Sequence, residues 1–162
     1  MEGVKSVCDC AFINFSNLLS VQLPMSFTSI ARGAFAYCRN LDSFIIPDSV
    51  EFIGNRAFEE CAFSSIKIPK SVVSFCGNPF TECKNLEEID ISENPNFVFV
   101  DGVLMGKKRS FIIYCVPSKS GNYAIPYRVT TIGASAFSGC YNLETIIIPS
   151  SVKEIGDEAF SG

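Results

Sequence analysis

The stretch from Leu41 to Cys61, LDSFIIPDSVEFIGNRAFEEC, decides the fold because its pattern returns along the chain. SIKIPKSVVSFCGNPFTEC from Ser65 and LETIIIPSSVKEIGDEAF from Leu143 repeat it, and the shared consensus is close to LxxIxIPxSVxxIGxxAFxxCxN. Repeat prolines such as Pro24 and Pro47 are 23 residues apart. A unit this short cannot bury its own apolar side chains, so it must stack on copies of itself. The sequence therefore predicts a solenoid.

Each repeat predicts the same succession of local structures. In LxxIxIP the first, fourth and sixth residues should point into the stack, while the second, third and fifth face solvent. Proline ends this strand because it has no N–H to donate, and SVxxIG supplies a second short strand on the opposite flank. The repeat glycine allows a backbone turn, and AFxxC suits a helical or 3₁₀ turn whose phenylalanine anchors the corner. Strands of the first kind are expected at residues 18–24, 41–47, 63–69, 86–92, 120–126 and 143–149.

One coil departs from the period. Ser92 takes the proline position, and the next repeat proline, Pro126, follows after 34 residues instead of 23. This longer coil contains two apolar runs, VFVDGVLM and SFIIYC, joined by Gly106-Lys107-Lys108-Arg109, which is a hairpin pattern. We expect residues 1–162 to form a single repeat array of about six 23-residue coils, with a β-hairpin insertion within 93–119 that leans out of the solenoid.

The repeat pattern is already under way at Val7 and Phe12, and it stops at Phe160, before the next repeat cysteine. We expect a piece of a longer array, truncated in mid-repeat at both ends and able to self-associate through its uncapped coils. No signal peptide pattern opens this sequence, and no apolar run approaches the roughly 20 residues of a membrane-spanning helix. We therefore expect no membrane insertion within this part of the protein.

Composition argues against several classes of function. Histidine is absent, which removes the commonest general base and the commonest nitrogen ligand of zinc. Seventeen acidic and thirteen basic residues give a net charge of -4, so the broad cationic field of nucleic-acid-binding proteins is missing. The sequence predicts neither an enzyme nor a nucleic-acid-binding protein, and we assign no catalytic, cofactor-binding or metal-binding residue.

The eight cysteines allow three interpretations. Four of them share one slot of the repeat, at positions 38, 61, 83 and 140, and Phe15 fills that slot in the first coil, which indicates an inward, apolar position. Stacked, buried thiols are the leading interpretation. A disulfide between neighbouring coils stays open, because strands about 5 Å apart can be bridged. The third interpretation is a metal site at Cys8 and Cys10, which would make the chain a metal-dependent enzyme.

The outward strand positions and the insertion's turn supply candidate binding residues. Carboxylates in the strand at 86–92 could perform acid–base chemistry, but their outward slots indicate solvated residues on an open sheet. An acidic face would favour a basic or polar protein partner, and exposed isoleucines along one sheet can anchor an interface. The basic turn is explained either by solubility or by contact with an anionic partner. The candidate protein-binding residues are Ile45, Lys67, Glu87, Glu88, Asp90, Glu144, Ile147, Lys107, Lys108 and Arg109.

The consensus resembles the BspA-like class of leucine-rich repeats, also called the Treponema pallidum type, over nearly the whole chain. The insertion NPNFVFVDGVLM also resembles a longer coil that recurs in that family, whereas Phe15, Ser92 and Phe75-Cys76 depart from its pattern. The resemblance implies a right-handed leucine-rich-repeat solenoid, with a parallel β sheet on the concave face and short strands and 3₁₀ or α turns on the convex side.

The same resemblance implies a function. Members of this class are cell-surface or extracellular, adhesin-like proteins that are not enzymes, need no cofactor and recognise a protein of a host or neighbouring cell, such as an extracellular-matrix or cell-surface protein. The alternative is an intracellular leucine-rich-repeat scaffold for protein–protein interaction, which a reduced cysteine ladder would suit better than a secreted protein.

Overall fold

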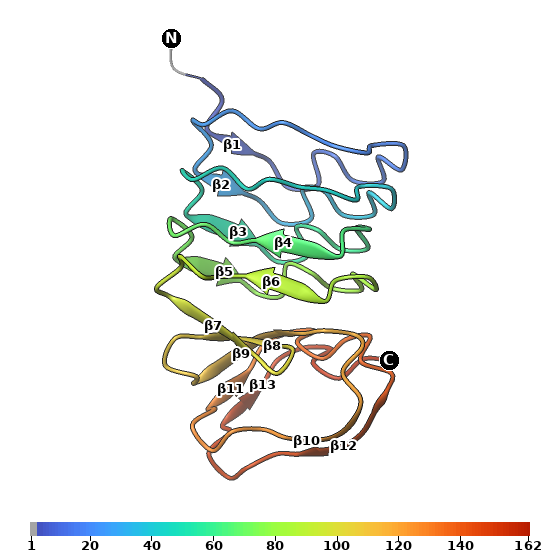
Figure 1. Cartoon of the computed structure of the whole chain (residues 1–162), viewed down its shortest axis with the longest axis vertical. Coiled ribbons are helices and arrows are strands. Elements are labelled where there is room, and N and C mark those ends of the chain that lie inside the picture. Colours follow the sequence, from blue (N-terminus) through green and yellow to red (C-terminus); the bar gives the residue numbers. More distant parts are fainter. Residues whose placement is uncertain (1–2) are drawn as a thin grey trace.

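The computed structural model describes residues 3–162 as a stack of short coils (Figure 1). The described residues form thirteen strands and no helix, so they include no helix that could cross a membrane. The strands are β1 (Ser6–Val7), β2 (Ser29–Ile30), β3 (Phe52–Gly54), β4 (Ser65–Lys67), β5 (Ser74–Cys76), β6 (Glu88–Asp90), β7 (Phe97–Val100), β8 (Val103–Gly106), β9 (Phe111–Cys115), β10 (Gly121–Ala124), β11 (Thr131–Ile132), β12 (Leu143–Ile147) and β13 (Glu154–Ile155). The predicted leucine-rich-repeat solenoid with parallel pairing is confirmed.

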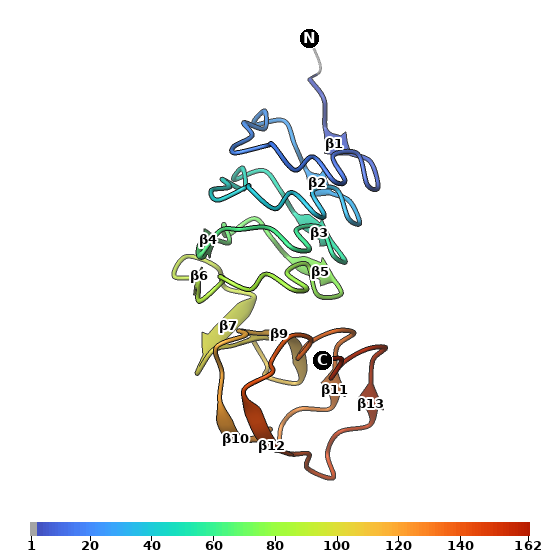
Figure 2. The ribbon, with the colours of Figure 1, turned by 90° about the vertical axis from the view of Figure 1, so that its right-hand side faces the viewer.

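The second extended stretch of each repeat forms the more regular wall of the solenoid. β1, β2, β3 and β5 pair in parallel, in that order, and Figure 2 shows them as one row. Ser6 pairs with Ser29, Ser29 with Phe52, and Phe52 with Ser74, so the pairing follows the sequence repeat from coil to coil. The repeat period therefore sets the register of this wall directly.

The opposite face, which carries β4, β6, β10 and β12, is called the concave face below. β4 pairs in parallel with β6, and β10 with β12, but these two pairs belong to separate sheets. Residues 18–24 and 41–47 are not paired as strands, so the expected continuous six-stranded sheet is wrong. The slot pattern holds in 41–47 nevertheless, because Phe44 and Ile46 are buried while Ile45 is exposed. Phe44 fills the slot that isoleucine fills in β4 and β6.

The corner segments are chains of hydrogen-bonded turns. In the third coil, Ala57 N–H donates to the Gly54 carbonyl at 3.3 Å and Cys61 N–H to the Phe58 carbonyl at 3.1 Å. The φ angles of Arg56 and Glu60 are 56° and 54°, which is the left-handed region, so a regular helix cannot form. Each corner also bonds the next coil, as when Phe58 N–H donates to the Pro79 carbonyl at 2.9 Å. The expected helical or 3₁₀ turn is thus corrected to non-helical turns.

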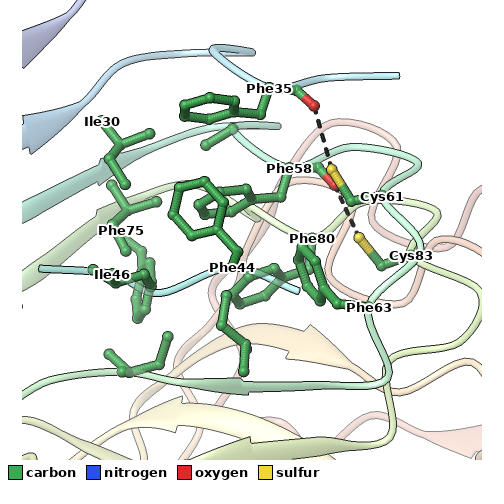
Figure 3. Close-up of a cluster of buried hydrophobic side chains, with 14 of the residues drawn as sticks. Ile30, Phe35, Phe44, Ile46, Phe58, Cys61, Phe63, Phe75, Phe80 and Cys83 are labelled. Carbon is green, nitrogen blue, oxygen red and sulfur yellow. Dashed lines mark hydrogen bonds between the residues drawn. The ribbon is translucent and has the colours of Figure 1, made fainter. Parts of the chain in front are cut away.

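The corner phenylalanines form a continuous aromatic stack (Figure 3). The ring centroids of Phe35 and Phe58 are 5.9 Å apart, those of Phe58 and Phe80 are also 5.9 Å apart, and both pairs are nearly parallel. Phe44 meets Phe58 edge-on at 4.7 Å. Phe58 is 0% exposed, as the repeat pattern predicts for a corner residue. Each ring is covered by the coils on both sides, so stacking supplies the burial that one coil lacks.

The long coil forms a three-stranded antiparallel meander, not a two-stranded hairpin. β7 pairs with β8, and β8 pairs with β9, while the other edge of β9 pairs in parallel with β11. VFVDGVLM therefore contains a hairpin of its own, turning at Asp101-Gly102, before the second turn at Lys107-Lys108-Arg109. The meander lies within the stack and does not lean out of it (Figures 1 and 2). Its third strand continues the wall of the solenoid.

The meander of β7, β8 and β9 is called the septum below, because it separates two buried clusters. In β8, Leu104 packs in the N-terminal cluster, while Val103 and Met105 pack in the C-terminal cluster. In β9, Ile112 likewise packs in the C-terminal cluster and Ile113 in the N-terminal one. Both faces of the septum are therefore buried. Strands that are buried on both faces read as nearly unbroken apolar runs, which accounts for the sequence of this segment.

The septum has no corner turn of the AFxxC kind, so corners far apart in sequence meet directly. The side-chain amide of Asn78 donates to the Ser135 carbonyl at 2.7 Å, and the Ser138 hydroxyl donates to Glu82 at 2.9 Å. Arg56 forms an ion pair with Glu158, 102 residues along the chain. The septum is thus inserted between the coils on the side of their strands, whereas the corner turns on either side of it remain in direct contact.

Candidate protein-binding surfaces

The acidic strand at the middle of the concave face carries three of the predicted residues. Glu87 and Glu88 are exposed, and Asp90 is partly exposed at the end of β6. Asp90 pairs with Lys67 across the two strands, and Lys67 Nζ donates to the Glu93 carboxylate at 2.8 Å. That hydrogen bond, together with the charge of Glu93, raises the pKa of Lys67. The patch is therefore acidic with one neutralised cation.

These three carboxylates differ in the hydrogen bonds that they accept from other residues of the chain. Asp90 accepts a hydrogen bond from the Ser92 backbone N–H at 2.9 Å, and this bond first, then the Ser92 hydroxyl, lowers the pKa of Asp90. Glu87 accepts the Ser118 hydroxyl. The Glu88 backbone N–H donates to the Ser64 carbonyl at 3.3 Å, but its carboxylate has no hydrogen bond or ion pair with any residue in the range 3–162. Serine in the proline position thus gives Asp90 a structural role in the turn, and Glu88 is the carboxylate that remains open to a partner.

Glu144 lies on β12, which is not in the same sheet as β6. The septum enters the stack between these sheets, so the structure does not bring Glu144 into the patch of Glu87, Glu88 and Asp90 (Figure 1). Ile147 is on β12 as well, and it is 58% exposed. The outward residues therefore form two separate groups on the concave face.

An apolar groove lies at the N-terminal end of the concave face. It has a volume of about 510 Å³, and its lining residues are Val21, Gln22, Leu23, Pro24, Met25, Ile45 and Pro47. Ile45 is 82% exposed and Met25 is 68% exposed, although both are large apolar side chains. Sequence analysis identified Ile45 from its outward slot but missed the groove, because Met25 follows the proline and belongs to no repeat slot.

The basic turn lies on the flank of the solenoid. Lys107, Lys108 and Arg109 are exposed in the turn between β8 and β9. The next residue, Ser110, accepts backbone hydrogen bonds from Thr130 and Thr131, which places the turn beside the start of the wall strand β11. The structure therefore separates the cationic turn from the concave face.

A cleft of about 380 Å³ lies where the two halves of the solenoid meet, and sequence analysis did not find it. Its lining residues are Lys84, Glu87, Pro117, Ser118, Gly139, Tyr141 and Asn142. Tyr141 is 64% exposed, and its hydroxyl lies 3.5 Å from the Glu82 carboxylate. The cleft joins residues from coils more than 50 positions apart in sequence. The 34-residue spacing from Ser92 to Pro126 identifies the irregular coil in the sequence, but no local motif predicts which side chains meet beside it.

The repeat cysteines form a ladder of thiols bonded to the backbone. Each thiol donates to the backbone carbonyl of the corner phenylalanine in the preceding coil: Cys38 to Phe12 at 3.1 Å, Cys61 to Phe35 at 3.3 Å and Cys83 to Phe58 at 2.9 Å. Figure 3 shows the last two contacts. Burial raises the pKa of Cys83 to about 12, so this thiol is poorly reactive. Cys8 and Cys10 are exposed, and residues 3–162 contain no group of three His, Cys, Asp or Glu side chains arranged to hold a metal ion.

The stacked coils, parallel walls and repeated corners define a leucine-rich-repeat solenoid, and sequence comparison identifies its type. A family profile described as "BspA type Leucine rich repeat region" matches six copies, over residues 5–100 and 114–162. The chain belongs to this BspA-type leucine-rich-repeat family. The break in the match covers part of the septum, so the segment that departs from the repeat in sequence is also the one that departs from it in structure.

Solved structures of bacterial proteins share this fold. A leucine-rich repeat protein from Eubacterium ventriosum ATCC 27560 is 30% identical with a TM-score of 0.82, over 100% of this chain and 50% of that one. A leucine rich cell surface protein from Faecalibacterium prausnitzii A2-165 is 30% identical, with a TM-score of 0.81 over 97% and 48%. The pneumococcal vaccine antigen PcpA is 27% identical, with a TM-score of 0.85 over 97% and 40%. The chain thus spans half or less of each structure, and no curated protein sequence matches it significantly.

Proposed function

We propose that this chain is a non-enzymatic protein-recognition module, exposed at the cell surface or outside the cell, with an adhesin-like role toward a protein of a host or neighbouring cell. Its membership of the BspA-type family supports this proposal. So do the descriptions of two structural relatives as a cell surface protein and a vaccine antigen. Extracellular-matrix and cell-surface proteins are the partner class to examine first.

The observation that carries the proposal is the pairing of bare apolar and unpartnered acidic side chains on the concave face. Ile45 is 82% exposed beside the apolar groove, and the Glu88 carboxylate has no partner among the described residues. An exposed apolar anchor contributes binding energy when a partner covers it, and an open carboxylate selects a basic side chain by complementarity. The partner surface that fits presents an apolar residue together with lysine or arginine. Lys107, Lys108 and Arg109 offer a separate contact to an anionic region.

Binding assays with matched variants test this assignment. The probes are immobilised fibronectin, immobilised laminin and fixed human epithelial cells, measured by biolayer interferometry or flow cytometry. We expect Ile45→Asp and Glu88→Lys each to weaken binding at least about tenfold, because each removes an interface anchor or reverses its charge. Val73→Asp and Glu51→Lys are the controls, since Val73 and Glu51 are exposed on the opposite wall. Equal losses in the controls, or none in the two concave variants, would refute binding through this face.

The intracellular scaffold is the rival function, and one observation favours it. All eight cysteines are free thiols in the structure, and three are bonded to backbone carbonyls in that form. Antibody labelling of the source cells separates the two locations. Labelling of intact cells supports the surface assignment, whereas labelling only after lysis supports the scaffold.

A further inference from the structure

Cys115 and Cys140 are placed differently from the other buried cysteines. Cys115 N–H donates to the Ala136 carbonyl at 2.8 Å, which is the bond that Phe35 N–H makes to Ala57. Cys115 therefore occupies the corner slot that phenylalanine fills in the regular coils. Cys140 fills the repeat-cysteine slot of the following coil, the slot whose thiol lies over the preceding corner residue. At this junction the thiol in the repeat-cysteine slot lies over a cysteine instead of a phenylalanine.

The contacts between the two residues agree with that geometry. Cys140 Sγ lies 3.7 Å from the Cys115 carbonyl oxygen and 3.6 Å from that of Val116. Cys115 Sγ also lies 3.6 Å from the Val116 oxygen. Both sulfurs thus approach the same carbonyl group from adjacent coils. Cys140 follows the corner turn and is not in a strand paired with β9, so these sulfur–backbone contacts are what bring the two cysteines together.

We propose that Cys115 and Cys140 form a disulfide under oxidising conditions, which locks the septum to the coil that follows it. The oxidant is a low-molecular-weight disulfide. The partly exposed Cys140 attacks it as a thiolate, forms a mixed disulfide and releases one small thiolate, which takes up the proton that Cys140 lost. Cys115 then gives up its proton and attacks the Cys140 sulfur, and the second small thiol leaves. Two protein thiols are oxidised and one small disulfide is reduced to two thiols.

The regular ladder should stay reduced under the same conditions. Cys38, Cys61 and Cys83 donate to phenylalanine carbonyls at 2.9 to 3.3 Å, which are shorter contacts than those of Cys140. A disulfide within the ladder would break two of these thiol hydrogen bonds in the buried core, and the carbonyls concerned would keep only their backbone N–H donors. The exchange is therefore selective for the pair at the septum.

The test uses the full chain with Cys8→Ser, Cys10→Ser and Cys76→Ser, because these three cysteines are exposed and could cross-link molecules. This background keeps the cysteines at 38, 61, 83, 115 and 140. Because Cys115 is 0% exposed, the protein is unfolded and refolded in a buffer of reduced and oxidised glutathione, so that access does not limit the reaction. We expect three thiols instead of five after denaturation, and a tryptic peptide joining Cys115 to Cys140. The midpoint of thermal unfolding should rise by roughly 5 to 10 °C relative to the reduced form.

Matched variants in the same background decide the assignment. Cys140→Ala should abolish both the loss of two thiols and the thermal shift. Cys38→Ala, which changes the same repeat slot at the other end of the ladder, should leave both intact. Five thiols in the refolded, oxidised protein would overturn the proposal, as would a disulfide peptide that joins two members of the ladder. The binding activity is not involved in these readouts, so they fail or succeed independently of the proposed function.

Discussion

The regular coils and the septum bury similar side chains in opposite ways. In the coil segment 41–47, Phe44 and Ile46 point into the core while Ile45 between them is 82% exposed. In the septum strand β8, neighbouring residues Leu104 and Met105 are both buried, because each side faces a different cluster. One-sided strands leave a row of side chains free to meet a partner, whereas a two-sided strand uses every side chain for cohesion. The candidate binding residues of the concave face accordingly all belong to the regular coils. The septum contributes only the basic turn between β8 and β9.

The largest effect is expected in the aromatic stack of the coils. Phe58→Ala should lower the free energy of unfolding by about 3 to 5 kcal/mol, because the ring is enclosed by Phe35, Phe44 and Phe80 and the coils cannot collapse into the vacancy. Urea unfolding followed by circular dichroism measures the loss. A value below about 1 kcal/mol would mean that water already fills the corner, and the stack would not be the main source of coil cohesion.

Paired substitutions in the two kinds of strand test the comparison directly. Leu104→Ala and Met105→Ala should each cost about 2 to 4 kcal/mol, because both side chains are buried. In the coil, Ile46→Ala should cost a similar amount, while Ile45→Ala should change stability by less than about 0.5 kcal/mol. The same urea titrations apply to all four variants. If Met105→Ala proves as mild as Ile45→Ala, one face of the septum is open to solvent and the two-cluster description fails.

The sequence predicts the coil better than the septum for a physical reason. The 23-residue period makes every coil bury the same slots, so one repeat explains Leu41, Phe58 and Cys61 as well as their copies. The septum has no copy in the chain, and its apolar runs fit a projecting hairpin as readily as a buried meander. The overlooked signal is the lack of alternation in FIIYCV, from Phe111 to Val116, because a strand with one solvated face would alternate apolar and polar residues.

The candidate surfaces were predictable only as far as the repeat extends. Outward slots correctly place Ile45 and Glu88 at the surface, because strand periodicity fixes the side to which a residue points. Periodicity does not fix partners, so it could not predict that Ser92 would bind Asp90 or that Ser118 would bind Glu87. These contacts depend on a substituted proline and on the septum, and neither belongs to the repeat.

Substituting one glycine in a regular coil and one in the septum compares a closely packed position with an open one. Gly54→Ala should cost about 1 to 3 kcal/mol, because its Cβ would lie 2.5 Å from the Arg32 backbone nitrogen in the preceding coil. Gly106→Ala should be within about 0.5 kcal/mol of the parent, since no atom lies within 4 Å of the corresponding position in the septum. The sequence pattern predicts that the repeat glycine allows a backbone turn, but Gly54 does not have a positive φ, and close approach to the neighbouring coil is what requires it. Equal effects in thermal unfolding would contradict this explanation.

The last prediction concerns a buried carboxyl group at a coil corner, and apart from the near-neutral comparison variants its effect is the smallest. Glu59 is 8% exposed, and burial raises the pKa of its carboxyl group, an effect that Arg56 and Tyr37 offset in part. The folded protein therefore holds this proton more tightly than the unfolded chain does, where the ordinary value is 4.5. The resulting stabilisation is complete below that pH and is lost as the pH rises through the folded pKa.

Glu59→Gln removes the titration, so its stability relative to the parent should increase as the pH rises from about 4 to about 7, by less than about 1 kcal/mol. The corresponding slot in the C-terminal half holds Ser138, which carries no charge, so the substitution makes the two halves alike at this corner. Urea midpoints at several pH values measure the difference, with Glu51→Gln as the control because Glu51 is exposed. If the stability of the variant relative to the parent falls as the pH rises, then Arg56 and Tyr37 outweigh burial, and Glu59 stabilises the corner as a charged group.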